Sequence, residues 1–149
     1  LLALDAIWKQ WSQFPNPIAY TASPDEHPPQ PAPNFHDIVS LRLGVEAQFA
    51  VDGFRLEPRL GLGWEPSPAP EQTGLHNYLD SDRIIAGLGF GLGWRMLRFD
   101  VMGQLQSMLP RVHVKDENAQ GLDQDNPGFP QVDHAGFIGF WGVELGVSL

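Results

Sequence analysis

Strict alternation of two kinds of residue over 83–95 is the feature that most limits how this chain can fold. The segment reads RIIAGLGFGLGWR. One parity is wholly apolar from Ile84 to Trp94, while the other holds four glycines and Ile85 between two arginines. Successive side chains of a strand point to opposite faces, so a period of two predicts an extended strand. A bulky face opposite a bare one suits a two-layer soluble sheet, or a barrel wall whose apolar face meets lipid.

The same alternation recurs along the chain, and the turns have signatures of their own. Asp52-Gly53 separates two alternating segments and suits a type I′ hairpin, because both positions tolerate positive φ. A second tight turn is expected at Arg95-Met96. We therefore predict an all-β chain without a helix, with six strands over approximately residues 1–13, 37–51, 54–65, 83–95, 97–114 and 134–149.

The connections differ sharply in length. Two are tight, whereas those over about 15–36, 65–82 and 110–133 are long, polar and rich in proline. In an up-and-down meander, alternate connections lie at the same end, so all tight turns should lie opposite all long loops. This asymmetry is typical of bacterial outer-membrane barrels, and the predicted strands are long enough for a tilted span. The pattern predicts an antiparallel up-and-down transmembrane β-barrel in a Gram-negative outer membrane.

Composition narrows the function classes. The net charge of −9 argues against a nucleic-acid partner, because phosphate binding needs a basic surface. The absence of cysteine excludes disulfides and thiolate metal sites. No apolar run is long enough for a membrane-spanning helix. The chain opens on Leu1 without Met or a signal peptide, so we expect a segment of a longer protein, with residues 1–149 belonging to one domain.

Three stretches resemble the FadL/TodX-type family of outer-membrane transporters for long-chain fatty acids and other hydrophobic compounds. The most specific is RLGLGWEPSPAP over 59–70, followed by LDSDR over 79–83 and the glycine-alternating strand. The second is DAIWKQWSQF over 5–14, and the third is the C-terminal strand. All three occur in the family's order and together cover most of the chain.

The resemblance implies a monomeric, fourteen-stranded barrel with an N-terminal hatch. This chain would supply its last six strands. Hydrophobic molecules would bind outside, move to a lumenal pocket and leave sideways through the wall, without catalysis or a cofactor. Two alternatives stay open: a soluble β-barrel or sandwich that holds a lipid internally, and an outer-membrane barrel of structural or adhesive role.

Candidate ligand contacts follow from the polar parity, which would face the lumen. Arginines could meet a fatty acid carboxylate and apolar side chains its acyl chain. For Arg42 and Arg59, a structural ion-pair network with Glu46, Arg55 and Glu57 is the favoured alternative. For Arg83, a salt bridge to Asp80 or Asp82 that anchors the loop is favoured. The predicted set is Arg42, Arg59, Arg83, Ile85, Met102, Met108, His134, Ile138 and Phe140.

Other features carry less specific signals. The five histidines lack metal-ligand spacing, and no nucleophile motif is present, so neither a metal site nor an enzyme is predicted. Pro58 lies inside a strand, where it predicts a bulge or a local loss of pairing. Trp64 and Trp94 fall at opposite strand ends and suit aromatic girdles, with ordinary packing as the alternative. The alternating glycines over 87–93 either leave room for a ligand or plug, or allow close strand packing.

Overall fold

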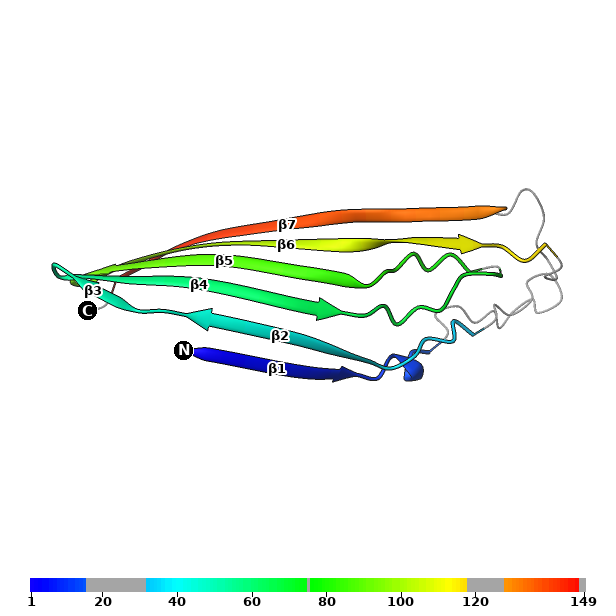
Figure 1. Ribbon diagram of the computed structural model, residues 1–149, viewed down its shortest axis with the longest axis horizontal. Helices are drawn as coiled ribbons and strands as arrows, with labels where there is room; N and C mark the ends of the chain where they lie inside the picture. The colour runs from blue at the N-terminus through cyan, green and yellow to red at the C-terminus, as the bar shows by residue number, and fades with distance from the viewer. Residues whose placement is uncertain (16–31, 75, 118–127, 148–149) are drawn as a thin grey trace, which may run out of the picture.

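The computed structural model describes residues 1–15, 32–74, 76–117 and 128–147, and these form one antiparallel sheet (Figure 1). The strands are β1 (Leu2–Lys9), β2 (Ile38–Glu46), β3 (Phe49–Val51), β4 (Phe54–Glu65), β5 (Arg83–Trp94), β6 (Leu97–Val114) and β7 (Gln131–Val147). They pair in the order β1-β2-β4-β5-β6-β7, and β3 extends the pairing of β4. The predicted all-β, antiparallel, up-and-down arrangement is confirmed. No helix among these residues is long and apolar enough to cross a membrane.

The two tight turns lie at one end of the sheet and the long connections at the other (Figure 1). Asp52 and Gly53 both have positive φ, at 50° and 83°, as the predicted type I′ hairpin requires. At the second tight turn Arg95 has a φ of 53°, and Trp94 pairs with Leu97. The expected separation of short and long connections is therefore present.

The register brings the apolar parity of every strand onto one face, which we call the apolar face. A representative row across the sheet pairs Val45 with Leu60, Leu60 with Leu88, Leu88 with Gly103 and Gly103 with Trp141. These side chains are exposed: Leu88 keeps 70% of its surface and Trp141 keeps 84%. Among the described residues, only Ile38 and Ala69 are buried hydrophobic side chains. The apolar face thus has no second layer over it in the described part of the chain.

The opposite face, which we call the glycine face, carries the polar parity. Its central row pairs Gly44 with Gly61, Gly61 with Gly87, Gly87 with Gln104 and Gln104 with Phe140. The middle of this face is bare on β2, β4 and β5, where the row is made of glycines, and most of its charged side chains lie towards the two ends of the strands.

The first predicted strand ends earlier than expected. A strand over 1–13 and the absence of any helix were predicted, but β1 stops at Lys9 and residues Trp11–Gln13 form one 3-10 turn. The Asp37 carboxylate accepts a hydrogen bond from the Ser12 backbone N–H at 2.9 Å, and Phe14 N–H donates to Trp11 C=O at 2.9 Å. Hydrogen bonds from Ser12 also lower the pKa of the exposed Asp37 carboxyl. These local bonds replace ladder pairing and turn the chain away from the sheet.

A proline splits the second predicted strand. The expected strand over 37–51 is observed as β2 and β3, separated at residues 47–48. Ala47 N–H donates to Pro58 C=O at 3.1 Å, but Pro58 has no N–H to return the bond. The register is the same on both sides of the gap, since Glu46 pairs with Arg59 and Phe49 with Leu56. Pro58 therefore causes a loss of pairing without a bulge.

A bulge in β6 redirects its last residues. The register shifts between Met108 and Arg111, around Pro110. A shift of one residue exchanges the faces of the side chains that follow. Arg111 consequently lies opposite His134, and Arg111, His113 and Lys115 join the glycine face. A second departure is that β7 begins at Gln131 instead of 134, while residues 148–149 of its predicted range lie outside the described residues.

Replacing Pro58 with valine should rejoin β2 and β3. A valine N–H can donate to the Ala47 carbonyl, and one such bond contributes about 1 kcal/mol of stability. We expect slow amide exchange at position 58 and a higher urea midpoint than for the unchanged protein. L60V places the same side chain on the apolar face but adds no donor, so it should give neither gain. Rapid exchange at the new amide would contradict this account of the gap.

Candidate functional site

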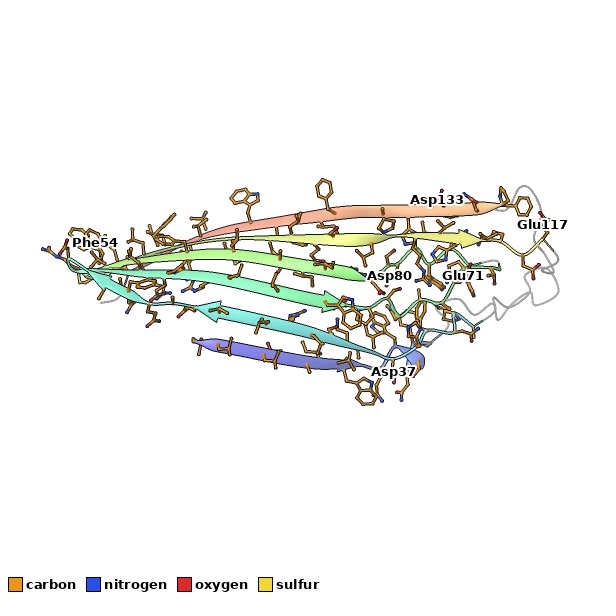
Figure 2. All side chains as sticks on the ribbon, viewed as in Figure 1. Asp37, Phe54, Glu71, Asp80, Glu117 and Asp133 are labelled. Atoms are coloured by element: carbon orange, nitrogen blue, oxygen red, sulfur yellow. The ribbon has the colours of Figure 1, made fainter. Side chains whose placement is uncertain are left out.

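All nine predicted contact residues lie on the glycine face, but in two separate groups. Met102, Ile138 and Phe140 lie at its centre with Arg42, Arg59 and Ile85, while Arg83, Met108 and His134 lie towards the long loops. In Figure 2, Asp80 and Glu71 mark the loop end, beyond the ends of β4 and β5, and Phe54 marks the opposite end. Sharing a face therefore does not make the nine residues one site.

The central group borders two shallow hollows that share lining residues. One has a volume of about 490 Å³ and is lined by Arg59, Met102 and Phe140 together with Gln104 and Gln106. Its neighbour has a volume of about 460 Å³ and is lined by Asp5, Arg42, Ile85 and the same two glutamines. Gly87 belongs to both hollows. We call this continuous depression, from Arg42 to Phe140, the trough.

The glycines of the 87–93 run have different roles at different positions. A Cβ built on Gly87 would meet only backbone oxygen, at 3.8 Å or more, so its missing side chain leaves open space in the trough. A Cβ on Gly91 would lie 2.9 Å from Asp100 Oδ1 and 3.0 Å from Glu57 Oε2. Glycine is required there because the carboxylates approach the strand closely. Both predicted roles of these glycines are thus present: Gly87 leaves room for a ligand, and Gly91 allows close packing.

Charged residues next to the trough form a closed ion-pair network at the tight-turn end. The Arg59 guanidinium donates to Glu46, Glu57 and Asp100, each at 2.7 Å. Arg98 also binds Glu57 and Asp100, both at 2.6 Å. Arg55 completes the network through a 2.8 Å contact with Glu57. For Arg59, the structure therefore shows the ion-pair network and not a ligand contact, because its guanidinium nitrogens already have carboxylate partners.

Arg42 lies outside this network. It pairs in register with Asp5 on β1 and Gly63 on β4, but it makes no ion pair with a described residue. Because β1 is the edge strand of the sheet, the Arg42 side chain on β2 is exposed at the end of the trough. Of the three predicted arginines, Arg42 is the one whose cation is left for a ligand within the described residues.

Arg83 holds a loop, as its favoured interpretation predicts. It pairs with Asp80, and with Glu65 at 3.7 Å. Glu65 also accepts a bond from Lys9, so β1, β4 and β5 are joined by charge at the loop end. Asp82 takes another part in anchoring this loop by accepting the Ser67 backbone N–H at 2.8 Å.

The bulge in β6 supplies further anchors for the connection over 66–82. Arg111 donates to Ala69 C=O at 2.9 Å and to Asp80 C=O at 3.1 Å. Lys115, only 3% exposed, donates to Gly74 C=O, His76 C=O and Asn77 Oδ1 at 2.7–2.8 Å. Burial lowers the pKa of the Lys115 ammonium. These bonds make the connection a fixed structure above the strands.

His134 belongs to this anchoring group and not to the trough. Its Nε2 lies 2.7 Å from Ser81 Oγ, and its ring stacks on His113 with centroids 5.1 Å apart and planes inclined by 7°. His113 Nδ1 accepts the Gln72 backbone N–H at 2.9 Å. Parallel rings direct their lone pairs in parallel planes, which is unsuited to sharing one metal ion. No cluster of three metal-ligating side chains occurs among the described residues.

Sequence reasoning missed the residues that depend on register. Gln104 and Gln106 were visible only as polar members of β6, and nothing local placed them at the centre of an apolar surround. His113 and Lys115 were missed because the predicted strand over 97–114 included no change of face, although Pro110 was itself a signal of an irregular strand.

Comparisons of the chain with protein-family models, with curated proteins and with solved structures found no match. The likeness to FadL/TodX-type transporters therefore stays a prediction from the sequence motifs, and the site is argued from its own geometry.

Replacing Glu57 with glutamine should destabilise the protein markedly. Glu57 is only 3% exposed and is shared by three arginines. E57Q therefore weakens three ion pairs at once and leaves Arg55 without its carboxylate among the described residues, at a cost of about 1–3 kcal/mol. The measurement is the urea midpoint of the variant against that of the unchanged protein. Glu144 lies on the same face opposite Asp100 and is exposed, so the matched variant E144Q should shift the midpoint little. Equal effects of the two variants would contradict a central role for Glu57.

Replacing Lys115 with methionine should loosen the loop without disturbing the sheet. K115M removes three hydrogen bonds to residues 74–77 while keeping an unbranched side chain in a buried position. We expect much faster amide exchange over 72–78 and unchanged exchange in β4 and β5. The control is K9M, which removes the other lysine of the chain and its bond to Glu65. If K9M accelerates amide exchange over 72–78 as strongly as K115M does, Lys115 is not the specific anchor of this loop.

Proposed function

We propose that this chain forms part of the wall of an outer-membrane β-barrel that takes up long-chain fatty acids or other hydrophobic small molecules. Its work would be binding and passage, without catalysis. The observation that carries the proposal is the sheet itself, whose apolar face is exposed across all its strands while its other face is polar and hollowed.

The exposed apolar face supports lipid as the surrounding medium. Large apolar patches on soluble proteins cover a few hundred Å² at most, and each exposed large side chain forgoes about 1.5–3 kcal/mol of burial. Here β2, β4, β5, β6 and β7 all present such side chains, including Leu62 at 51% and Leu145 at 73% exposure. Lipid would cover this face without a second protein layer.

Aromatic residues at both ends of the apolar face suit the two membrane interfaces. Trp64 lies near the loop end, while Trp94 stacks on Phe54 at the tight-turn end, with centroids 6.0 Å apart. Arg95 lies 4.9 Å above the Trp94 ring, which places a cation at the expected polar boundary. Between these ends, β4 and β5 each have 12 residues, slightly more than the roughly 9–11 of a tilted spanning strand.

The open edges of the sheet support a larger barrel. β1 and β7 each have a neighbour on one side only in the described residues. Unpaired backbone groups cost several kcal/mol each in hydrocarbon, so such edges have to be closed by further strands. The resemblance to the FadL/TodX-type family supplies the expected form, a monomer of fourteen strands whose hatch precedes this chain.

The glycine face supplies a surface for an apolar ligand. Ile85, Met102 and Phe140 border the trough, and Gly87 leaves it open. Arg42, which has no ion pair among the described residues, would be the partner for a fatty acid carboxylate.

Spin labels at two sites would test which face meets lipid. The chain has no cysteine, so single substitutions L88C and Q104C can be labelled without background in the full-length protein in lipid bilayers. We expect the label at 88 to be accessible to oxygen, which partitions into lipid, and shielded from a water-soluble nickel chelate. The matched label at 104, on the opposite face, should be far less accessible to oxygen.

The alternatives predict other outcomes. In a soluble lipid-binding protein the apolar face points inward, so the label at 88 would be shielded from both reagents and the protein would be stable without detergent. A purely structural or adhesive barrel would give the lipid pattern but would show no saturable binding of a hydrophobic ligand.

A further inference from the structure

The charges along the tight-turn side of the trough disfavour a carboxylate on that side. Arg55, Arg59 and Arg98 are matched there by Glu46, Glu57 and Asp100, and Glu144 adds a further carboxylate opposite Asp100. Three cations against four anions leave an excess negative charge. An anion entering this region would lose its hydration without gaining a cation, which is unfavourable.

Two glutamines occupy the middle of the trough. The amides of Gln104 and Gln106 make no hydrogen bond to a described residue, and both line the two hollows. They are two residues apart on β6, so they leave the same face about 7 Å from each other along the strand. Each offers donors and an acceptor but no charge.

The surroundings of these glutamines are apolar. Gln104 pairs with bare Gly87 on one side and with Phe140 on the other. Gln106 pairs with Ile85 and Ile138. The apolar side chains next to the two amides, across the ladder or two residues along β6, are Ile85, Met102, Met108, Ile138 and Phe140. The arginines closest to this set are already ion-paired: Arg83 lies opposite Met108, and Arg59 lines the same hollow as Met102.

We propose that Gln104 and Gln106 form a neutral polar subsite, which accepts a hydrophobic molecule bearing an uncharged polar group, such as a long-chain alcohol or ester, in preference to a fatty acid anion. This inference rests on the proposed function and narrows its substrate class. The ligand's hydroxyl or carbonyl group would bond to the amides, and its chain would lie over Gly87 towards Phe140.

The competing arrangement is a fatty acid whose carboxylate is bound by Arg42. The row of Arg42 reaches Gln106 through Gly63 and Ile85, which is three strand spacings or about 14 Å. A carboxylate anchored at Arg42 would therefore place its polar group far from the glutamines, so variants of the two positions separate the two modes.

The test compares matched twelve-carbon ligands. Radiolabelled dodecan-1-ol, laurate and dodecane would be titrated onto the full-length protein in lipid nanodiscs at pH 8, with empty nanodiscs subtracted. We expect dodecan-1-ol to bind about tenfold more tightly than laurate. The double variant Q104L/Q106L should weaken dodecan-1-ol binding by about tenfold, the effect of losing two neutral hydrogen bonds, and should leave dodecane binding unchanged.

Three other results would overturn the glutamine subsite. Laurate binding that equals or exceeds that of dodecan-1-ol, and that R42Q abolishes, would overturn the glutamine subsite while leaving hydrophobic transport in place. Equal losses of dodecane and dodecan-1-ol in Q104L/Q106L would also overturn it, because the variant would then have damaged the trough as a whole. If none of the three ligands binds saturably, the proposed function itself fails and the subsite fails with it.

Discussion

The hydrogen-bonded register of the sheet decides which side chains share a face, and a slip of one residue would place Leu88 opposite Gln104. The ladder from β4 to β5 keeps one register through twelve pairs, from Phe54–Trp94 to Glu65–Arg83. The same agreement continues into β6 as far as Met108. Because side chains alternate strictly along a strand, this register produces both the exposed apolar face and the trough behind it. Everything inferred about lipid and ligand depends on that separation of faces.

Two prolines interrupt this regularity with different consequences. Pro58 removes one donor and leaves the register unchanged, so β2 and β3 remain parts of one edge of β4. Near Pro110 the register shifts, and the faces of the following residues are exchanged. That exchange brings Arg111, His113 and Lys115 against the connection over 66–82, where they bond its backbone. A strand irregularity thereby becomes the support of a loop.

The charged residues divide the glycine face into a closed part and an open part. At the tight-turn end, Glu57 is shared by three arginines, and Arg59 is itself shared by three carboxylates. Residues that are fully paired in this way hold the strands together and have little left for a ligand. The trough begins where this network ends. Its polar groups are uncharged at the centre. Arg42, whose cation has no ion pair in the part of the chain that the structure describes, lies at the far end. Charge pairing, more than the mere presence of arginine, thus sets which ligand chemistry the face can accept.

The sequence alone determined the strand positions, the two tight turns and the faces of most residues, because a period of two and a turn motif are local properties of the backbone. It placed Arg83 in a loop anchor for the same reason, since Asp80 is three residues away. Only the tertiary structure decided which arginines are paired, because Arg59, Arg98 and their carboxylates come from different strands. Only register could place Gln104 and Gln106 among apolar neighbours from β5 and β7, and only the bulge could move His113 and Lys115 to the other face. Contacts between strands depend on long-range pairing, which no local pattern specifies.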